Sequence, residues 1–389
     1  MTKSGARKVL EEWAARVAGV SEETLGWRVW HHDFVEPFHA AILEVEPFSS
    51  LKFAWLFGPD DSGELLDTRL PRWLIQKLQS GTAPEKIIEQ VEAEISENVS
   101  HLCDVTAIFG ADIDAEVELK NGIKLIPSGR IPERWHDQKV QRPLNESWFD
   151  PHDCCLLVQE ISVTPAVKFR KSLQEEPNSN EAFTNPPQND RVQILEPLRA
   201  AFLLAGSNAI ELPARTIVEE GDRLLVVSGF RTGSLAPGHL PRASKFESAK
   251  IQGLFSELSK FGEREPLLRA IDRIGRSRMD RAPADQALDL GIAAEILLMH
   301  GSQDGNAEIT NKLSMRAAWL LGMTVDERAE TAKRTKNLYS ARSKVAHTGN
   351  LSDPAKFDRS AADQLVSDVA RVILSRGSFP KWETLCLGG

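Results

Sequence analysis

The sequence contains no long apolar run and little cysteine. No stretch approaches the roughly 18 apolar residues that a membrane span requires. The N-terminal MTKSGARKVLEEWAARV has basic residues but no apolar region after them, which argues against a secretory signal and predicts an amphipathic helix. The four cysteines form no CxxC pair, which is typical of a chain in a reducing compartment. We therefore expect a cytoplasmic protein that does not enter a membrane.

Familiar cofactor patterns are also missing. There is no Walker A or GxGxxG sequence, so nucleotide hydrolysis is not indicated. Residues 31–39 (HHDFVEPFH) are rich in groups that bind metals, but they lack a recognised ligand spacing, and a polar entry into a strand explains them better. Residues 152–155 (HDCC) favour a turn before a buried strand over zinc. We expect no cofactor and no metal.

Negative charge is unevenly distributed. The chain has a net charge of −9. Residues 1–250 hold 27 basic against 38 acidic residues, a net charge of −11, whereas residues 251–389 hold 20 against 18, a net charge of +2. The first part would repel a polyanion and the second would tolerate one, so any contact with nucleic acid must be local.

Residues 1–232 mix helical and strand patterns, which predicts an α+β domain. We expect helices at 5–18, 70–80 and 84–98, strands at 39–46, 51–57, 155–163 and 223–229, a hairpin at 115–127 around Asn121-Gly122, and a mobile loop at 172–191. A linker is expected at 233–243. The role of this first domain is not evident from its residues, and a sensing or regulatory function is inferred from the architecture alone.

Residues 244–377 predict an all-α bundle, followed by a tail at 378–389, because strand patterns vanish after the linker. We expect six helices: from a capping box at Ser244…Glu247 to Gly262, after Pro266, from Pro283 to Gly301, from about 305 to Gly322, from a capping box at Thr324…Glu327 to Gly349, and from Asp353-Pro354 to Gly377.

The third of these helices contains LDLGIAAEILLMH (288–300), whose only charges before His300 are Asp289 and Glu295. Glu295 shares a helix face with Leu288, Ile292 and Met299, so we expect a largely dry carboxylate. A buried carboxylate requires a cationic partner. A structural ion pair is one interpretation of Glu295 and a catalytic role is the other.

The fifth helix supplies the candidate partner. Tyr339, Arg342, Val345 and Ala346 form one stripe that we expect to face inward. His347 lies in the last turn, where the helix dipole favours positive charge and where it can donate or accept a proton. Lys333, Arg334, Lys336 and Lys344 add local positive charge.

The spacing of the two key residues constrains any site. Arg342 and His347 are five residues apart, or about 140° around a regular helix. They share a face only if the last turn unwinds at residues 347–349, or they meet across a dimer axis. The alternative is that Arg342 only pairs with Glu295 and His347 only satisfies the helix end.

Residues 342–347 (RSKVAH) match the Rx4–6H motif of the HEPN superfamily, and LYSARSKVAHTG resembles its Apea-like subgroup. Two further subgroup landmarks are recognisable at residues 289–297 (DLGIAAEIL) and 312–322 (KLSMRAAWLLG). The resemblance covers roughly residues 245–375. Ser343 departs from the Asn, Asp or His that often follows the Arg in the superfamily, although it suits this subgroup; the departure puts cleavage rate and base preference in doubt.

The resemblance implies a metal-independent endoribonuclease that acts as a homodimer or higher homo-oligomer, of the kind found in anti-phage defence, abortive infection and toxin systems. Arg342 and His347 would then be catalytic, with Glu295, Tyr339, Ser343 and Asp289 in support and RNA bound by Lys333, Arg334, Lys336 and Lys344. Residues 1–232 would sense a phage or cellular trigger. The alternative is a non-catalytic HEPN module that binds RNA or protein and serves as an oligomerisation scaffold. A third interpretation, an enzyme within residues 1–240, has no nucleophile and base to support it.

Overall fold

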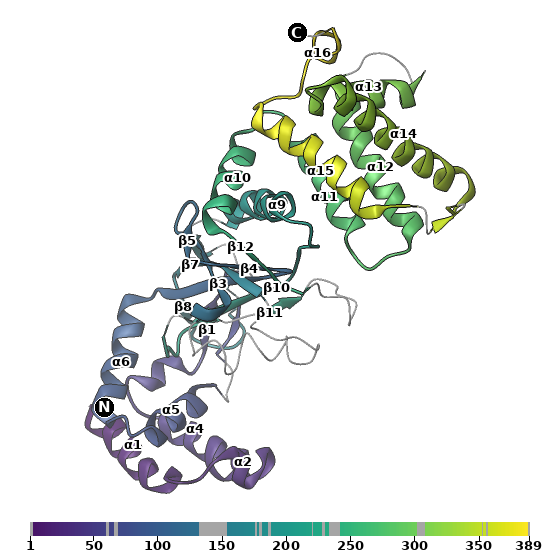
Figure 1. Ribbon diagram of the computed structural model, residues 1–389. Coiled ribbons are helices and arrows are strands. Elements are labelled where there is room, and N and C mark those ends of the chain that lie inside the picture. Colours follow the sequence, from purple (N-terminus) through teal and green to yellow (C-terminus); the bar gives the residue numbers. More distant parts are fainter. Residues whose placement is uncertain are drawn as a thin grey trace. The chain divides into compact units, whose positions relative to one another are not determined.

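A computed structural model describes residues 3–59, 62–65, 69–131, 154–175, 177–178, 181–185, 188–219, 221–227, 230–232, 242–301, 308–351, 353–354 and 357–387 (Figure 1). Within these ranges, no helix combines the length and apolar character needed to cross a bilayer. Three parts of the sequence analysed above lie outside the described residues: His152-Asp153, most of the expected linker and part of the expected loop at 172–191.

The chain forms two compact units whose segments alternate along the sequence. Unit 1 comprises Met1–Val105, Gln159–Gln188 and Thr216–Arg231, and unit 2 comprises Thr106–Val158, Asn189–Arg215 and Thr232–Gly389. The helices expected at 244–377 therefore belong to the same unit as segments from the first 232 residues. The division into domains at 233–243 stays a prediction.

Unit 1 is mainly helical around an aromatic and aliphatic core. Its helical elements are α1 (Lys3–Val17), α2 (Glu22–Leu25), α3 (Trp27–Trp30), the π-helix η1 (His31–Val35), α4 (Glu36–Ile42), the 3-10 helix η2 (Phe48–Leu51), α5 (Arg69–Gln79) and α6 (Pro84–Glu97). The expected helices at 5–18, 70–80 and 84–98 are confirmed. Leu70, Leu74 and Leu78 recur every four residues on α5, so they lie on one face and are buried together.

The strands form two sheets and one isolated pair. The small sheet has the order β2 (Ser62–Glu64), β1 (Ala54–Phe57), β8 (Val167–Phe169). The large sheet has the order β11 (Phe230–Thr232), β10 (Glu211–Glu219), β3 (Ser100–Phe109), β7 (Cys154–Thr164), β6 (Ile123–Ile126), β5 (Val117–Glu118), with β9 (Phe183–Asn185) on β7. β4 (Ala111–Ile113) pairs in parallel with β12 (Ser244–Phe246). The short 3-10 helix η3 (Ser128–Arg130) follows β6.

The predicted hairpin at 115–127 is confirmed. β5 and β6 are antiparallel, with Val117 opposite Leu125. Asn121 and Gly122 both have positive φ angles, of 54° and 71°. Asn-Gly tolerates this conformation, which matches the twist of the two strands. The turn residues alone were therefore sufficient to predict this element.

The C-terminal part of unit 2 is helical, as expected. Its helices are α10 (Ser248–Lys260), α11 (Arg264–Ser277), α12 (Pro283–Met299), α13 (Ile309–Leu321), α14 (Val325–Thr348), α15 (Arg359–Ser375) and α16 (Trp382–Cys386). An earlier segment of the chain forms α9 (Gln188–Ala205). Helices α11 to α15 lie side by side (Figure 1). They bury Ile271, Leu290, Leu313 and Ile373 in one apolar core. The predicted capping box of α14 is present, since Thr324 and Glu327 exchange hydrogen bonds of 3.2 and 3.0 Å.

Two strand predictions are wrong. Residues 39–46 belong to α4 and the turn after it, because Phe38 and Ile42, four residues apart, bury one helical face. Residues 223–227, the described part of the expected strand at 223–229, form no strand. The buried Glu94 carboxylate accepts the backbone N–H groups of Leu224 and Leu225 at 3.0 Å each, in place of a neighbouring strand.

The predicted capping box at Ser244…Glu247 is also wrong. Ser244 belongs to β12, and α10 starts at Ser248. The Ser248 N–H donates to Asp114 Oδ1 at 2.8 Å, so the free N–H at the start of this helix is satisfied by a distant side chain. Phe246 is nevertheless buried, as its position in the apolar pattern predicts.

Helices α12 and α14 pack tightly against each other at Gly291. A Cβ atom built on Gly291 would collide with the Cβ and Cγ atoms of Arg342. These atoms belong to the stem of the side chain and cannot move away without shifting α14. Gly291 is therefore needed so that Arg342 can lie flat against α12.

We predict that Gly291→Ala destabilises the protein by about 1–3 kcal/mol through overpacking. The matched control is Gly253→Ala in α10, where an added Cβ meets nothing within 4 Å. That change should stabilise the helix by roughly 0.8–1 kcal/mol, because alanine is the better helix former. Urea unfolding of both variants measures the difference, and a neutral or stabilising Gly291→Ala would contradict this account of the packing.

Candidate functional site

The side chains of Arg342 and Glu295 form an ion pair between α14 and α12. Arg342 Nη2 donates to Glu295 Oε2 at 2.9 Å, and the two side chains are 25% and 24% exposed. Tyr339, the only tyrosine in the chain, lies one turn before Arg342, and its hydroxyl also interacts with the Glu295 carboxylate. The expected cationic partner of Glu295 is thus Arg342.

Burial and charge act in opposite directions on the Glu295 carboxyl. Partial burial raises its pKa above the ordinary value, while Arg342 and Tyr339 lower it by smaller amounts. The pKa of Tyr339 is raised, first by burial and then by the neighbouring Glu295 charge. Glu295 is half-buried together with Leu288, Ile292 and Met299, which confirms the shared helix face but not the largely dry environment.

Arg342 has hydrogen-bonding capacity left after pairing with Glu295. Its buried Nε has no hydrogen-bond partner within the described part of the chain. The guanidinium of Arg342 lies 5.7 Å from the centre of the Tyr339 ring. The aliphatic stem of the Arg342 side chain lies against Gly291. Tyr339 and Glu295 therefore fix the orientation of a guanidinium group that is still partly accessible and can accept a further anion.

His347 does not join Arg342 within one chain. Helix α14 stays regular as far as Thr348 and ends with Gly349 in the left-handed conformation at φ 74°. The last turn therefore does not unwind at His347, and the two residues remain about 140° apart around the helix. His347 is exposed. Ala346, which we expected to face inward, is also exposed. Only Val345 lies on the buried face of the helix here, and Ala346 lies beyond the edge of that face.

The other predicted site residues are divided between the surface and structural contacts. Lys333, Lys336 and Lys344 are exposed, and Ser343 is half-buried. Arg334 donates to the carbonyl of Ala361 at 2.8 Å, which ties α14 to α15. None of these contacts brings them to the Arg342–Glu295 pair.

Asp289 anchors two arginines at the other edge of α12. It is buried, and its carboxylate pairs with Arg273 at 2.8 Å and with Arg281 at 2.9 Å. This contact holds α11 against α12. The structure therefore gives Asp289 a packing role, on the opposite edge of α12 from Arg342.

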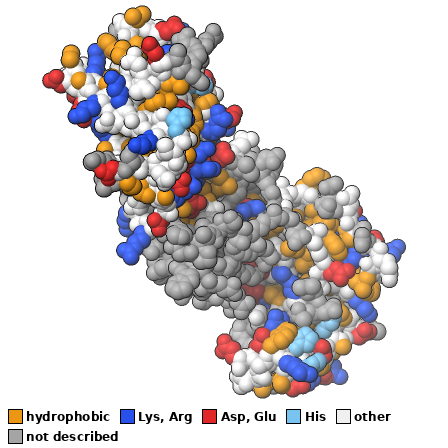
Figure 2. Space-filling view, turned by 90° about the vertical axis from the view of Figure 1, so that its right-hand side faces the viewer, with side chains coloured by type: hydrophobic (Ala, Val, Ile, Leu, Met, Phe, Trp, Pro, Cys, Tyr) orange, Lys and Arg blue, Asp and Glu red, His pale blue; other side chains and the backbone are white. Residues whose placement is uncertain are grey.

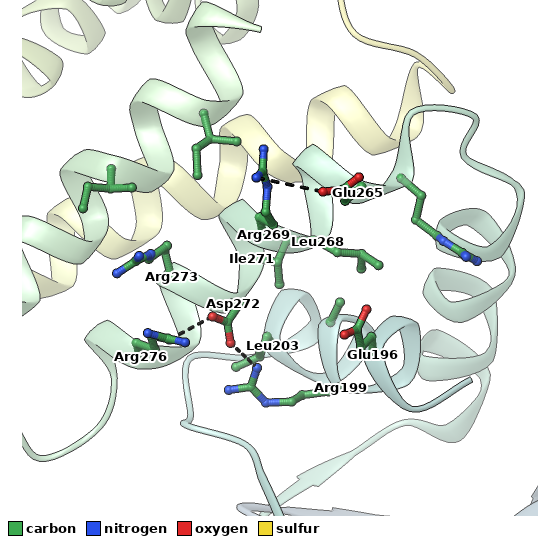
Figure 3. Close-up of a pocket in the computed structure, with 14 residues that line it drawn as sticks. Glu196, Arg199, Leu203, Glu265, Leu268, Arg269, Ile271, Asp272, Arg273 and Arg276 are labelled. Carbon is green, nitrogen blue, oxygen red and sulfur yellow. Dashed lines mark hydrogen bonds and ion pairs between the residues drawn. The ribbon is translucent and has the colours of Figure 1, made fainter. Parts of the chain in front are cut away.

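A cavity of about 770 Å³, which was not predicted from the sequence, is lined by α9, α11 and α12 (Figure 3). Five arginines line it: Arg199, Arg264, Arg269, Arg273 and Arg276. Three acidic residues, Glu196, Glu265 and Asp272, lie among them, and Asp272 pairs with both Arg199 (2.6 Å) and Arg276 (2.8 Å). The carboxylate of Asp272 thus pairs with two guanidinium groups, as that of Asp289 does. The cavity lining contains more cations than anions.

The arginines of α11 were visible in the sequence REPLLRAIDRIGRS as a repeat of basic residues every three to five positions. Arg269, Arg273 and Arg276 lie within about 60° of one another around the helix. This spacing predicts a basic stripe, but the contribution of Arg199 requires the fold, because α9 lies some 70 residues earlier in the chain.

The arginine cavity and the Arg342–Glu295 pair share one face of α12. Ile292 and Ile296 line the cavity, and Glu295 lies between them in the sequence. All three are half-buried. The same helix face therefore carries an ion pair at one edge, an apolar strip in the middle and arginines from α11 at the other edge.

In unit 1, His31, His32 and Glu36 place their ligand atoms within 4.8 Å of one another. Histidine side chains lie at the surface near the bottom of Figure 2. These are residues of the 31–39 segment, for which the sequence favoured a strand entry. The structure replaces that strand with the helical elements η1 and α4.

No family model, curated protein or solved structure matches the chain. What can be inferred about function therefore comes from the residues of the Arg342 site, the arginine cavity and the histidine cluster.

We predict opposite pH dependences for two glutamates on neighbouring helices. The folded pKa of Glu295 is raised, so ionisation opposes folding. The stability of the wild type relative to Glu295→Gln should fall as pH rises from the ordinary pKa of 4.5 through the raised pKa.

The exposed Glu327 has a lowered pKa because backbone N–H groups bind it. The wild type should therefore lose stability relative to Glu327→Gln as pH falls through that lowered pKa.

Denaturant unfolding over a pH series checks both signs. If the stability difference for Glu295→Gln instead grows with pH, attraction by Arg342 outweighs the burial of the carboxylate.

Proposed function

We propose that the chain is a metal-independent endoribonuclease of the HEPN type that acts as a homodimer. The observation that carries this proposal is the guanidinium of Arg342, oriented by Glu295 and Tyr339 and still partly exposed, with His347 on the surface five residues later. The helical arrangement of α11 to α15 is compatible with the resemblance in the sequence. Arg342 sits within the motif that resembles HEPN ribonucleases.

Arg342 would stabilise negative charge on the phosphate as the new bond forms. A guanidinium held at a fixed angle offers two parallel N–H donors to phosphate oxygens without reorganising during the reaction. Glu295 and Tyr339 act as positioning residues, since they bind Arg342 and not the substrate. The flat packing of the Arg342 stem on Gly291 restricts the side chain further.

His347 would move protons between the 2′-hydroxyl, which attacks the phosphate, and the leaving 5′-oxygen. An exposed imidazole in the last turn of a helix is accessible to a substrate. Because His347 and Arg342 point in different directions on a regular α14, we propose that Arg342 of one protomer and His347 of the other form each site. Two equivalent sites follow from a two-fold axis.

The arginine cavity would bind the RNA backbone next to this site. Arg269, Arg273 and Arg276 span about 10 Å along α11, a length over which a stacked strand carries about three phosphates. Ile292 and Ile296 provide apolar contact for bases between these arginines and Arg342. This local concentration of arginine would allow an acidic protein to bind RNA.

Such ribonucleases act in anti-phage defence and toxin systems, and we propose a role of that kind in the cytoplasm. The segments before residue 232 would sense the phage or cellular trigger.

The second candidate is a non-catalytic HEPN module that binds RNA or protein and serves as an oligomerisation scaffold. The observation that favours it is the Arg342–Glu295 ion pair together with the regular last turn of α14. Both features are also those of a structural ion pair and an ordinary helix end.

Catalysis is tested by RNA cleavage in the presence of EDTA. His347→Ala should reduce the rate about 10²–10⁴-fold, and Arg342→Ala about 10²–10³-fold. Arg342→Lys retains the charge for Glu295 but loses the paired donors, so it separates catalysis from folding. His101→Ala, which removes a half-buried histidine of unit 1, is the control and should cleave as the wild type does.

Mixing the two inactive variants tests the shared site. In a dimer of one Arg342→Ala and one His347→Ala protomer, one site regains both wild-type residues, so activity should return on mixing. Full cleavage by either variant alone contradicts the catalytic assignment. Inactive mixtures that still form mixed dimers contradict the arrangement across protomers.

The arginine cavity is tested by the salt dependence of RNA binding, measured in the His347→Ala background with a labelled single-stranded oligouridylate. Each lost phosphate contact reduces the slope of log K against log salt by about 0.7, so Arg269→Gln/Arg276→Gln should reduce it by about 1.4. Both residues are more than half exposed, which protects the fold. Arg376→Gln, on exposed Arg376 beyond α15, should leave the slope unchanged. An unchanged slope in the double variant excludes the cavity as the backbone site.

A further inference from the structure

The exposed part of unit 1 contains a cluster of two histidines and one glutamate. Glu36 Oε1 lies 3.3 Å from His31 Nδ1, and Glu36 Oε2 lies 3.0 Å from His32 Nδ1. Each carboxylate oxygen therefore faces a different imidazole. All three residues come from one continuous stretch of chain, so the cluster does not depend on long-range packing.

A change of helix type brings these three side chains together. His31 and Glu36 are five residues apart, which is the repeat of a π-helix, and residues 31–35 form the π-helix η1. His32 and Glu36 are four residues apart, which suits the α-helix that continues as α4. In a regular α-helix His31 would lie about 140° from Glu36. The wider turn therefore places both histidines on one carboxylate.

Neighbouring aromatic residues hold His31 in place. The Trp27 ring lies edge-on to the His31 ring at 4.8 Å between centres, and His31 is only 21% exposed. Arg72 stacks on Trp27 at 3.8 Å and is neutralised by Glu22, which accepts two hydrogen bonds of 2.9 Å. Its charge is thus already balanced by a partner other than Glu36.

We propose that His31, His32 and Glu36 form a zinc site. Two imidazole nitrogens and one carboxylate oxygen are ligands that Zn²⁺ accepts in tetrahedral geometry at about 2.0–2.2 Å. Ligand atoms within 4.8 Å of one another reach such an ion through small side-chain rotations. The exposure of His32 and Glu36, 59% and 55%, leaves the fourth position open to water or an outside ligand.

The experiment is zinc titration of the full chain by calorimetry after removal of metal with a chelator. We expect one zinc ion at this site, and loss of one of its three ligands in His32→Ala or Glu36→Gln should weaken binding by at least about tenfold. The matched control is His101→Ala. His101 pairs with Glu97 at 2.9 Å with the same four-residue spacing, but the described part of the chain adds no third ligand to this pair. Removal of His101 should therefore not change zinc affinity.

Replacement of zinc by Co²⁺ provides a second measurement, because the visible spectrum distinguishes a tetrahedral site from the hydrated ion. The tetrahedral spectrum should appear in the wild type and in His101→Ala and vanish in Glu36→Gln. Circular dichroism checks that each variant is folded. Zinc affinity that is equal in the wild type, His32→Ala and Glu36→Gln, or no binding in any of them, would overturn the proposal. Neither readout depends on RNA cleavage.

Discussion

The contact of Arg342 with α12 determines how the C-terminal helices are arranged around the candidate site. Gly291 leaves room for the stem of the arginine, and Glu295, one turn later, binds its guanidinium group at 2.9 Å. Neither feature would be useful alone. Without Gly291 the helices would separate, and without Glu295 a partly buried positive charge would have no counter-ion. One glycine and one carboxylate on the same helix thus fix the position of one guanidinium.

The elements that sequence predicted well are those set by neighbouring residues. Asn121-Gly122 specifies its own turn, and Thr324 and Glu327 cap their own helix. The pairing of Glu295 with Arg342 followed from a single argument, that a charge on an apolar helix needs a partner. The periodicity of apolar residues in α12 predicted the helix face that carries Glu295.

Two of the errors arose where a distant residue supplies a hydrogen bond. Asp114 caps α10 in place of Ser244, and Glu94 binds the backbone of residues 224 and 225 in place of a strand. Both partners lie more than 100 residues away in the sequence. The arginine cavity follows the same logic, since α11 supplies a basic stripe that becomes a cavity only when α9 packs beside it. Local patterns contain no information on such contacts.

The chain contains the same five-residue interval in two settings. Between His31 and Glu36 the π-helix brings the two side chains together, so the histidine cluster is complete within each molecule. Between Arg342 and His347 the regular α-helix keeps the two side chains apart, so the proposed catalytic site must be completed by a second molecule. Occupancy of the first is then independent of protein concentration. Activity at the proposed catalytic site would follow the population of dimers, which rises with the square of the free monomer concentration while dimers are scarce. Doubling the free monomer would then raise this activity about fourfold and leave the occupancy of the histidine cluster unaffected.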